Sequence, residues 1–311
     1  MKKIGRREFV RRMACLGAFF AGSYAGRSLK AQEQEVPPTP EPWPYLVVVR
    51  GPDPAEITRQ AIAALGGMER FVTLGDDVII KPNICVAYHT YEYAATTNPQ
   101  VVGTLVTLCW EAGAGRVRVM DLPFGGEPPE AYRISGIEEA VLAAGGEMEI
   151  MSQMKYVRAQ IPEGRDIKEW DVYEDVLNAN VLINVPIAKH HSLARLTLGM
   201  KNLMGVILDR PAIHQNLGQR IADLTSLVRP TLTVVDAVRI LVNNGPTGGN
   251  LNDVRKVDTV IASTDIVAAD SYAATLFGLS GADIAYIKAG AEMGLGQMDL
   301  SAIEISEINL S

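Results

Sequence analysis

The sequence predicts an α/β fold in which a mostly parallel sheet carries helices on both faces. From Tyr45 onward, short runs rich in β-branched residues alternate with segments of helical periodicity. One run, Val181–Val185, is apolar almost throughout, as is typical of a parallel strand that is buried on both faces. Polar side chains directly follow several of these runs. These observations predict an α/β domain over residues 45–311, with a site at the carboxyl ends of its strands.

The expected elements alternate along the chain. Strands are expected at Leu46–Arg50, Asp77–Ile80, Val117–Asp121, Glu147–Met151, Val181–Val185, Leu232–Val235 and Val257–Ala262. Helices are expected at Pro54–Leu65, Pro99–Ala112, Gly136–Ala144, Ile221–Val228 and Ile266–Phe277. The strand runs are short and rich in Val and Ile, whereas the helical segments repeat their apolar residues every three or four positions. The order of the strands in the sheet stays open.

The first 31 residues have the composition of a secretory signal. Met1–Arg12 is strongly basic, and the apolar run Met13–Gly26 that follows is too short to span a bilayer as a stable helix. The pair Arg6-Arg7 has a large apolar residue two positions after it, which resembles the twin-arginine consensus. We therefore expect residues 1–31 to be a twin-arginine signal peptide that directs the chain to the periplasm or another extracytoplasmic compartment. The alternative is a basic arm that stays on the protein.

The charge that remains after cleavage constrains the partners of the protein. Residues 1–31 hold eight of the 29 basic and one of the 36 acidic residues, so the rest carries 21 basic and 35 acidic groups, a formal net charge of −14. Such a chain is not expected to bind nucleic acid or anionic membranes through bulk charge, and cleavage leaves no stable membrane anchor. The partners expected are the twin-arginine translocase and a small-molecule ligand. Residues 32–44 contain five prolines and predict an extended linker.

Cysteine usage limits the cofactors. Cys15 lies in the signal, so only Cys85 and Cys109 remain after cleavage. Two thiols cannot ligate an iron–sulfur cluster of the four-cysteine kind, which makes that cofactor unlikely. A disulfide is one alternative, and two buried thiols are the favoured one, because Cys109 lies in an apolar helical pattern.

Polar groups that follow the strands are candidates for ligand binding. Lys81 and Asn83 flank a proline after the second strand, and Asp236 follows Val235. Asn244 and Gly245 begin a Gly-rich segment whose backbone N–H groups would suit an anion. Ordinary turn chemistry also places Asn, Asp and Gly at such positions, and a turn without a ligand is an equal alternative for the Gly-rich segment.

The densest group of polar residues lies between positions 189 and 214. It contains three of the four histidines and two lysines, and its candidates are Lys189, His190, His191, Lys201, Asn202 and His214. Histidine is the usual proton carrier near neutral pH, and a lysine in a dry pocket serves as base, nucleophile or anion anchor. The spacing fits no standard zinc motif, yet a divalent metal held by His191, His214 and a carboxylate stays open. The plain alternative is a basic loop with helix-capping histidines.

Two carboxylates near the start of the last helix are weaker candidates. Asp265 is well placed as its N-cap, which is a structural role. Asp270 lies five residues further on and is either buried or directed at the site.

Seven segments resemble the family known as domain of unknown function 362. They are VIIKPNI (78–84), TNPQVV (97–102), VLINVPIAKHH (181–191), TLGMKNLMG (197–205), LTVVDA (232–237), NGPTGG (244–249) and ASTDIVAADSYAA (262–274). They occur in order across most of residues 45–280. The resemblance implies an α/β fold and no settled activity. Many relatives carry a ferredoxin-like cluster segment, but the cysteines for it are missing here.

A second resemblance, in the order of elements, is to the nickel-pincer lactate racemase family. It implies His191 as a proton carrier, Lys201 as a cofactor lysine and His214 as a metal ligand. The chain departs from that pattern in two segments. Lys81-Pro82-Asn83 replaces a threonine-arginine-proline signature, and Asp121-Leu122-Pro123 replaces a glycine-threonine-histidine-arginine loop. The pincer cofactor is therefore not expected.

The candidates together predict an exported enzyme for an anionic or carbonyl-bearing small molecule. In this hypothesis Lys81, Asn83, Lys189 and Lys201 bind the substrate or a cofactor, and His190 or His191 moves a proton. Asp236 would orient a histidine or a ligand group. Two other classes stay open: a periplasmic binding or cofactor-carrier protein without turnover, and a maturation partner of an exported redox enzyme.

Overall fold

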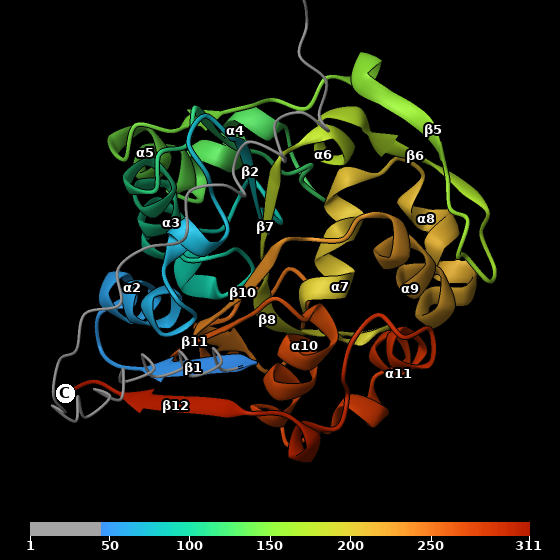
Figure 1. Ribbon diagram of the computed structural model, residues 1–311. Coiled ribbons are helices and arrows are strands. Elements are labelled where there is room, and N and C mark those ends of the chain that lie inside the picture. The colour runs from blue at the N-terminus through green and yellow to red at the C-terminus, as the bar shows by residue number, and fades with distance from the viewer. Residues whose placement is uncertain (1–44) are drawn as a thin grey trace, which may run out of the picture. The chain divides into compact units, whose positions relative to one another are not determined.

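A computed structural model describes residues 45–311, so the predicted signal peptide and linker lie outside the described residues. The main sheet has ten strands: β1 (Leu46–Arg50), β2 (Asp77–Pro82), β3 (Arg116–Val119), β4 (Glu147–Met148), β7 (Val181–Val185), β8 (Ile187–His191), β9 (Arg195–Thr197), β10 (Leu232–Leu241), β11 (Val254–Ser263) and β12 (Ile305–Asn309). Their order is β12-β1-β11-β10-β7-β2-β3-β4, and β8 pairs with β10 and β9 (Figure 1).

The sheet is mostly parallel, as the sequence predicts. The block β10-β7-β2-β3-β4 is parallel throughout, and β1 runs parallel to β12. The exceptions are β11, which is antiparallel to both β10 and β1, and the hairpin β8–β9. Residues 242–253 join β10 to β11 with a single 3-10 turn and no crossover helix, and such a hairpin-like connection suits antiparallel neighbours.

Helices cover both faces of the sheet, which confirms the predicted fold class. One group is α2 (Pro54–Ala64), α3 (Pro99–Glu111), α4 (Pro128–Ile134) and α5 (Ile137–Ala143). The other is α7 (Gly199–Asn202), α8 (Arg210–Ile213), α9 (Leu217–Leu227), α10 (Ile266–Thr275) and α11 (Ala285–Glu292). Figure 1 shows the first group on the left of the central strands and the second on the right. A short helix, α6 (Glu174–Asn178), leads into β7.

Two hydrophobic cores result, one on each face of the sheet. Successive side chains of a strand point to opposite faces, and β1 shows this directly. Leu46 and Val48 belong to the core beneath α9, α10 and α11, whereas Val47 and Val49 belong to the core beneath α2 and α3. The β-branched residues that define the strands in the sequence thus fill both layers.

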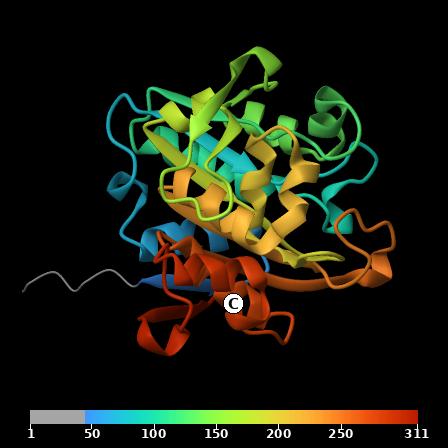
Figure 2. The same cartoon turned by 90° about the vertical axis from the view of Figure 1, so that its right-hand side faces the viewer.

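A separate hairpin, β5 (Tyr156–Gln160) and β6 (Glu169–Tyr173), was not expected from the sequence. Its burial is uneven, because Trp170 and Val172 pack into the core whereas several of their neighbours are exposed. The Trp170 indole N–H donates to the Leu208 carbonyl at 2.8 Å. Figure 2 shows the hairpin at the upper end of the molecule, beyond the helices of the second group. It covers the segment that follows α7.

Several predicted boundaries are wrong by a few residues, and two of the corrections concern candidate site residues. Lys189, His190 and His191 were expected in a loop after β7, but they form strand β8, which pairs with β9 and β10. Asp236 was expected after the end of its strand, but β10 continues through it to Leu241. These segments lack the apolar pattern of a strand because they carry polar side chains, and pairing with β9, β10 and β11 makes them strands.

Cys85 and Cys109 are both buried and free, so the favoured expectation of two thiols is confirmed and the disulfide alternative is wrong. Within residues 45–311, no helix is both long and apolar enough to cross a bilayer.

Candidate functional site

A cavity of about 530 Å³ lies at the carboxyl ends of β2 and β3. It brings together seven of the predicted site residues: Lys81, Asn83, Lys189, His191, Lys201, Asn202 and His214. The other lining residues are Ile84, Cys85, Asp121, Leu122, Phe124, Ser192, Leu193, Thr197, Met204, Gly205, Arg210, Pro211, Pro246 and Thr247. Three lysines and one arginine thus face a single carboxylate. The wall therefore carries excess positive charge.

The strand geometry of β8 selects which of its side chains reach the cavity. Lys189 and His191 are two residues apart and line it, whereas His190 lies between them and faces the other way. The His190 Nδ1 atom accepts a hydrogen bond from the Gly245 backbone N–H at 3.1 Å. A Cβ atom at position 245 would lie 1.9 Å from the His190 carbonyl oxygen, so only glycine fits there.

Lys81 enters the site from the end of β2 and forms a buried ion pair. Its Nζ lies 2.7 Å from Asp121 Oδ1, and both side chains are almost inaccessible. Burial lowers the pKa of Lys81 to about 8 and also raises the pKa of Asp121, although each charge stabilises the other. A Cβ atom at Gly205 would lie 2.0 Å from Asp121 Oδ1, so the glycine gives the pair its room.

Asparagines connect two of the lysines. Asn202 Oδ1 accepts from Lys81 Nζ at 3.0 Å and from Asn83 Nδ2 at 2.9 Å. Asn83 Oδ1 in turn accepts from Lys189 Nζ at 2.9 Å. Asn184, the register partner of Lys81 on β7, accepts from Asn202 Nδ2 at 2.8 Å. The network holds the two ammonium groups in fixed positions without neutralising them.

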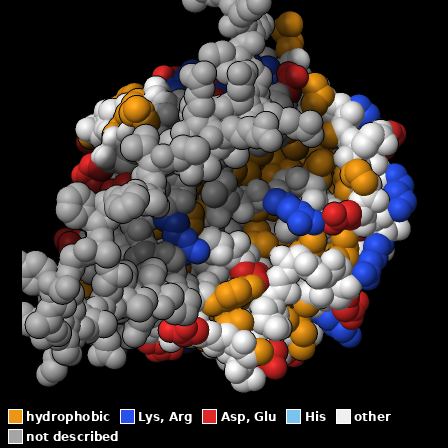
Figure 3. All heavy atoms as spheres, in the orientation of Figure 1, with side chains coloured by type: hydrophobic (Ala, Val, Ile, Leu, Met, Phe, Trp, Pro, Cys, Tyr) orange, Lys and Arg blue, Asp and Glu red, His pale blue; other side chains and the backbone are white. Residues whose placement is uncertain are grey.

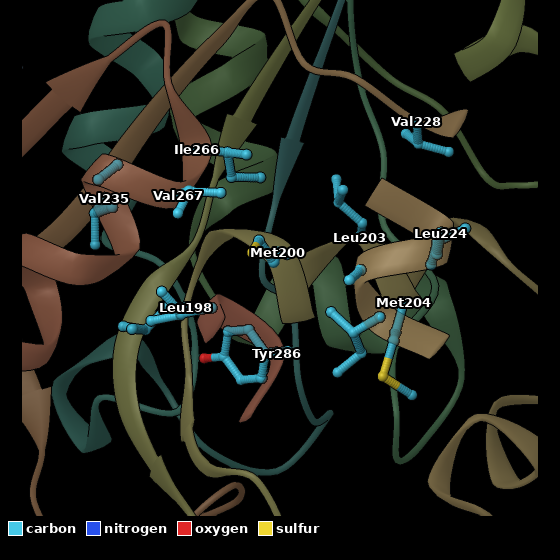
Figure 4. Packing of buried hydrophobic residues seen from close by; sticks show 14 of the residues in the cluster. Leu198, Met200, Leu203, Met204, Leu224, Val228, Val235, Ile266, Val267 and Tyr286 are labelled. Atoms are coloured by element: carbon cyan, nitrogen blue, oxygen red, sulfur yellow. The ribbon is translucent and has the colours of Figure 1, made fainter. Parts of the chain in front are cut away.

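The turn α7 presents Lys201 and Asn202 to the cavity because its other residues are anchored in the core. Met200 of α7 and Leu203, which directly follows the helix, are fully buried, and Figure 4 shows them among apolar residues of neighbouring elements. Burying each such side chain contributes about 1.5–3 kcal/mol to folding. The Asp270 carboxylate accepts from the Gly199 and Met200 backbone N–H groups at 2.6 and 2.9 Å. These contacts position Lys201 from behind.

Lys201 differs from the other two lysines in its partners. Among residues 45–311, its Nζ has one hydrogen-bond contact, to the Met204 sulfur at 3.5 Å, and a thioether is a weak acceptor. Lys189 Nζ, by contrast, donates to the Ala95 carbonyl at 2.6 Å as well as to Asn83. Burial, reinforced by the charge of Lys189, lowers the pKa of Lys201 to about 8. Lys201 therefore gives up its proton more readily than an exposed lysine does.

His191 is held as a neutral imidazole. Its Nδ1 accepts from the Leu193 and Ala194 backbone N–H groups at 3.1 and 3.3 Å, so the ring proton is on Nε2. Burial, together with the positive charge of Lys201, lowers the pKa of His191 to about 3. His191 is thus a hydrogen-bond donor through Nε2 and a poor base.

His214 has the opposite tautomer. Its Nδ1 lies 2.9 Å from the Arg210 carbonyl oxygen, which accepts but cannot donate, so Nδ1 carries the proton. In the neutral ring Nε2 is then free to accept a proton. The two rings are nearly parallel, with their centroids 6.4 Å apart. The cavity therefore holds one imidazole that donates and one that accepts.

The rim of the cavity is apolar. The side chains of Phe124 and Leu193 are 71% and 69% exposed, respectively, although both line the cavity. Arg210 is fixed nearby, because its guanidinium donates to the carbonyls of Leu122 and Pro123. On the face drawn in Figure 3, basic and acidic side chains alternate along the right-hand edge.

Four predicted site residues do not line the cavity: His190, Asp236, Asn244 and Gly245. Asp236 is fully buried and accepts from the Asn98 and Val238 backbone N–H groups, and burial raises its pKa to about 6. It contacts no histidine within the described residues. Asn244 donates to Asp253 at 2.8 Å, and the anion role proposed for the Gly-rich segment stays a prediction.

The two weaker candidates have structural positions. Asp265 caps α10 as predicted, accepting from Val267 and Ala268, and Asp270 is buried behind α7. Over residues 45–311, no three His, Cys, Asp or Glu side chains lie close enough together to hold a metal ion. His191 and His214 thus lack a third ligand, and the metal site stays a prediction.

Several lining residues escaped the sequence reasoning. Arg210 is the first residue of α8 and lies one helical turn before His214. This four-residue spacing could have indicated that the two side chains lie on the same side of the helix. Asp121 was expected as the last residue of its strand and was not assigned to the site, whereas β3 ends at Val119 and Asp121 follows it. Cys85, Phe124 and Leu193 come from loops whose course no local pattern reveals.

Comparison with known proteins completes this description. A thylakoid-associated protein of Synechocystis sp. is 26% identical over 252 residues, covering 76% of this chain and 74% of the relative. The lactate racemase apoprotein from Thermoanaerobacterium thermosaccharolyticum aligns at a TM-score of 0.41 and 9% identity, covering 73% of this chain and 56% of its own. A protein from Thermotoga maritima aligns at a TM-score of 0.43 and 11% identity, and the alignment covers 74% of this chain and 60% of that protein. This chain therefore spans less than two thirds of either solved structure.

The sequence profile of DUF362, a domain of unknown function, matches residues 78–275. The match includes every residue from Lys81 to His214 that was predicted for the site. It covers more than half of the chain, so the protein belongs to the DUF362 family.

Proposed function

We propose that the protein is an enzyme that binds a small organic anion in this cavity and moves a proton on it. The observation that carries the proposal is the charge of the lining: Lys81, Lys189, Lys201 and Arg210 surround one carboxylate, Asp121. A volume of about 530 Å³ falls within the range of small-molecule sites, roughly 300–1,000 Å³. Buried cations that are not neutralised attract an anion strongly, because the surrounding dielectric is low.

The asparagine network supports a place for the anionic group near Lys81 and Lys189. Lys81 and Lys189 are held through Asn83 and Asn202, and both lysines line the cavity. A carboxylate near the two ammonium groups would accept a charge-assisted hydrogen bond from the third N–H of Lys189. Lys81 would attract it through its charge alone, because its three N–H groups already have oxygen partners. The rest of such a ligand would extend toward the two histidines and the apolar rim.

The histidine tautomers support proton chemistry. His214 Nε2 would accept a proton from the ligand, while His191 Nε2–H would donate a hydrogen bond to the oxygen on which negative charge develops. This assignment changes the roles predicted from the sequence, because His191 becomes the electrophile and His214 the base. A neutral imidazole suits the first role, because its proton does not dissociate easily.

Hydrogen exchange in deuterated water tests the proposal. The panel is pyruvate, acetoacetate, malonate and propionate, and loss of the C–H signal beside the carbonyl group is followed by NMR. We expect the protein to accelerate exchange for at least one of the first three acids. His214→Gln should lower that rate by at least about 100-fold, the usual contribution of a general base.

The fourth histidine supplies a matched control. His89 stacks on Tyr93 and does not line the cavity, so His89→Gln should exchange at the wild-type rate. If calorimetry detects binding of an acid but no hydrogen exchange is found, the protein is a carrier and not an enzyme. No binding of any acid in the panel would contradict the proposal altogether.

We also propose export by the twin-arginine route, on the strength of Arg6-Arg7 and the apolar run behind them. In cell fractionation, replacing both Arg6 and Arg7 by Lys should retain the chain in the cytoplasm with its N-terminus intact. Replacing Arg11 and Arg12 by Lys leaves the consensus in place and should leave export unchanged. Equal fractionation of the two double variants would contradict this route.

A further inference from the structure

We propose that Lys201 forms an imine with the carbonyl group of its ligand, which makes the ligand class the 2-oxo carboxylic acids. The inference rests on the proposed function, because it takes the same cavity and the same anion contacts. It adds a covalent step and names the nucleophile. Three observations carry it: the partners of the three lysines, the position of Lys201, and the pair of histidines.

Hydrogen bonding separates Lys201 from its neighbours. Lys81 Nζ has three oxygen partners, among them Asp121 at 2.7 Å, and Lys189 Nζ has two. Such contacts hold an amine in its charged form, whose nitrogen has no lone pair to attack with. Lys201 Nζ has the Met204 sulfur as its sole hydrogen-bond partner within the described residues. Of the three lysines, Lys201 is therefore the one whose amine the fewest hydrogen bonds hold in place, which leaves its nitrogen available to react.

The position of Lys201 suits a reacting group. The side chain is 92% buried, since its exposure is 8%, and it lines the cavity from α7. Asp270 fixes the start of α7 through two backbone N–H groups, and Asn202, the next residue, belongs to the network that holds Lys81. The amine and the proposed carboxylate site are thus fixed by adjacent residues.

The chemistry balances with the groups present. The neutral Lys201 amine adds to the carbonyl carbon, and the carbonyl oxygen becomes the hydroxyl of a carbinolamine. Loss of that hydroxyl as water, with one proton supplied and one removed from nitrogen, gives the C=N bond. No oxidant or reductant is consumed. His191 Nε2–H lines the cavity to assist the oxygen, and His214 Nε2 to exchange the proton.

The lysines near the proposed reaction site explain why the ligand should carry a carboxylate next to its carbonyl group. With its carboxylate between Lys81 and Lys189, a ligand would present the adjacent carbon to the Asn202 side of the cavity, where Lys201 lies. An aldehyde or ketone without the acid would lack these contacts. An acid without the carbonyl would bind and not react.

Reductive trapping tests the imine. The full-length protein is incubated with pyruvate and sodium cyanoborohydride, digested, and mapped by mass spectrometry. We expect one reduced pyruvate adduct, located on Lys201. Propionate, which has the carboxylate and lacks the reactive carbonyl, should give no adduct and should protect against pyruvate.

Two variants complete the design. Lys201→Arg keeps a positive charge but cannot form an imine, because the guanidinium does not lose its proton. It should bind pyruvate, as measured by calorimetry, and give no adduct. Lys288→Arg changes an exposed lysine of α11 and should give the wild-type adduct.

The outcomes separate this inference from the proposed function. Pyruvate binding without an adduct, or an adduct on Lys81 or Lys189 in place of Lys201, overturns the imine and leaves the anion site standing. Absence of any pyruvate or propionate binding overturns both. The mapping in the wild-type protein and the propionate control decide the question even if Lys201→Arg does not fold.

Discussion

Replacing Lys81 by Met is expected to lower the free energy of unfolding by about 3–5 kcal/mol, the usual cost of leaving a buried charge without its partner. The Asp121 carboxylate would remain beneath the cavity, 4% exposed, with one backbone N–H from Ile84 still donating at 2.6 Å. Asp121→Asn should cost a similar amount, because it leaves the Lys81 ammonium buried.

The double variant distinguishes a buried ion pair from two independent contacts. Lys81→Met combined with Asp121→Asn removes both charges and keeps the amide oxygen that Ile84 needs. We expect its loss of stability to be clearly smaller than the sum of the two single losses. Urea unfolding of the four proteins measures the coupling. Additive losses would contradict the assignment of a coupled pair at this site.

A surface pair provides the comparison. Arg116 and Glu147 also form an ion pair, but both side chains are about half exposed. Glu147→Gln should therefore cost less than about 1 kcal/mol, because water screens the attraction. The contrast between the two pairs tests burial as the cause of the large effect.

Much of the fold was predictable because its signals are local. Val181–Val185 has the apolar run of a strand buried on both faces, and it lies inside the sheet as β7. Asn98 and Pro99 are typical N-cap and first-turn residues, and in the structure the Asn98 side chain caps α3. Strand order was not predictable, because β12 pairs with β1 across the whole length of the domain.

The candidate site was predictable in composition and not in geometry. Turns do not require lysine or histidine, and five of the predicted lysines and histidines do meet in one cavity, together with Asn83 and Asn202. His191 faces the cavity and His190 faces away because β8 is a strand, in which successive side chains point to opposite sides. The strand depends on its pairing with β9, which the sequence pattern does not reveal. The Lys81–Asp121 pair joins two strand ends whose adjacency no local pattern encodes.

Binding of a small dicarboxylate such as oxalate is expected to take up protons and to weaken at alkaline pH. Burial lowers the pKa values of Lys81 and Lys201 to about 8 in the free protein. A bound anion stabilises the charged amines and raises those pKa values again. Below a pH of about 8, Lys81 and Lys201 are already protonated in the free protein and can bind the anion directly. Above that pH, each lysine must first take up a proton. Each such proton weakens binding by about 10-fold per pH unit.

Control variants assign the effect to the cavity. Lys81→Met and Lys201→Met should each weaken oxalate binding and reduce the number of protons taken up. Lys256→Met removes an exposed lysine paired with Asp258 and should change neither quantity.

Isothermal titration calorimetry with oxalate, repeated in buffers of different ionisation enthalpy on both sides of pH 8, measures this directly. The cationic cavity predicts one binding site per chain, proton uptake near the pKa of the two lysines, and an affinity that falls as pH rises through it. No binding, or an affinity that is independent of pH with no proton uptake, would contradict an anion site built on these lysines.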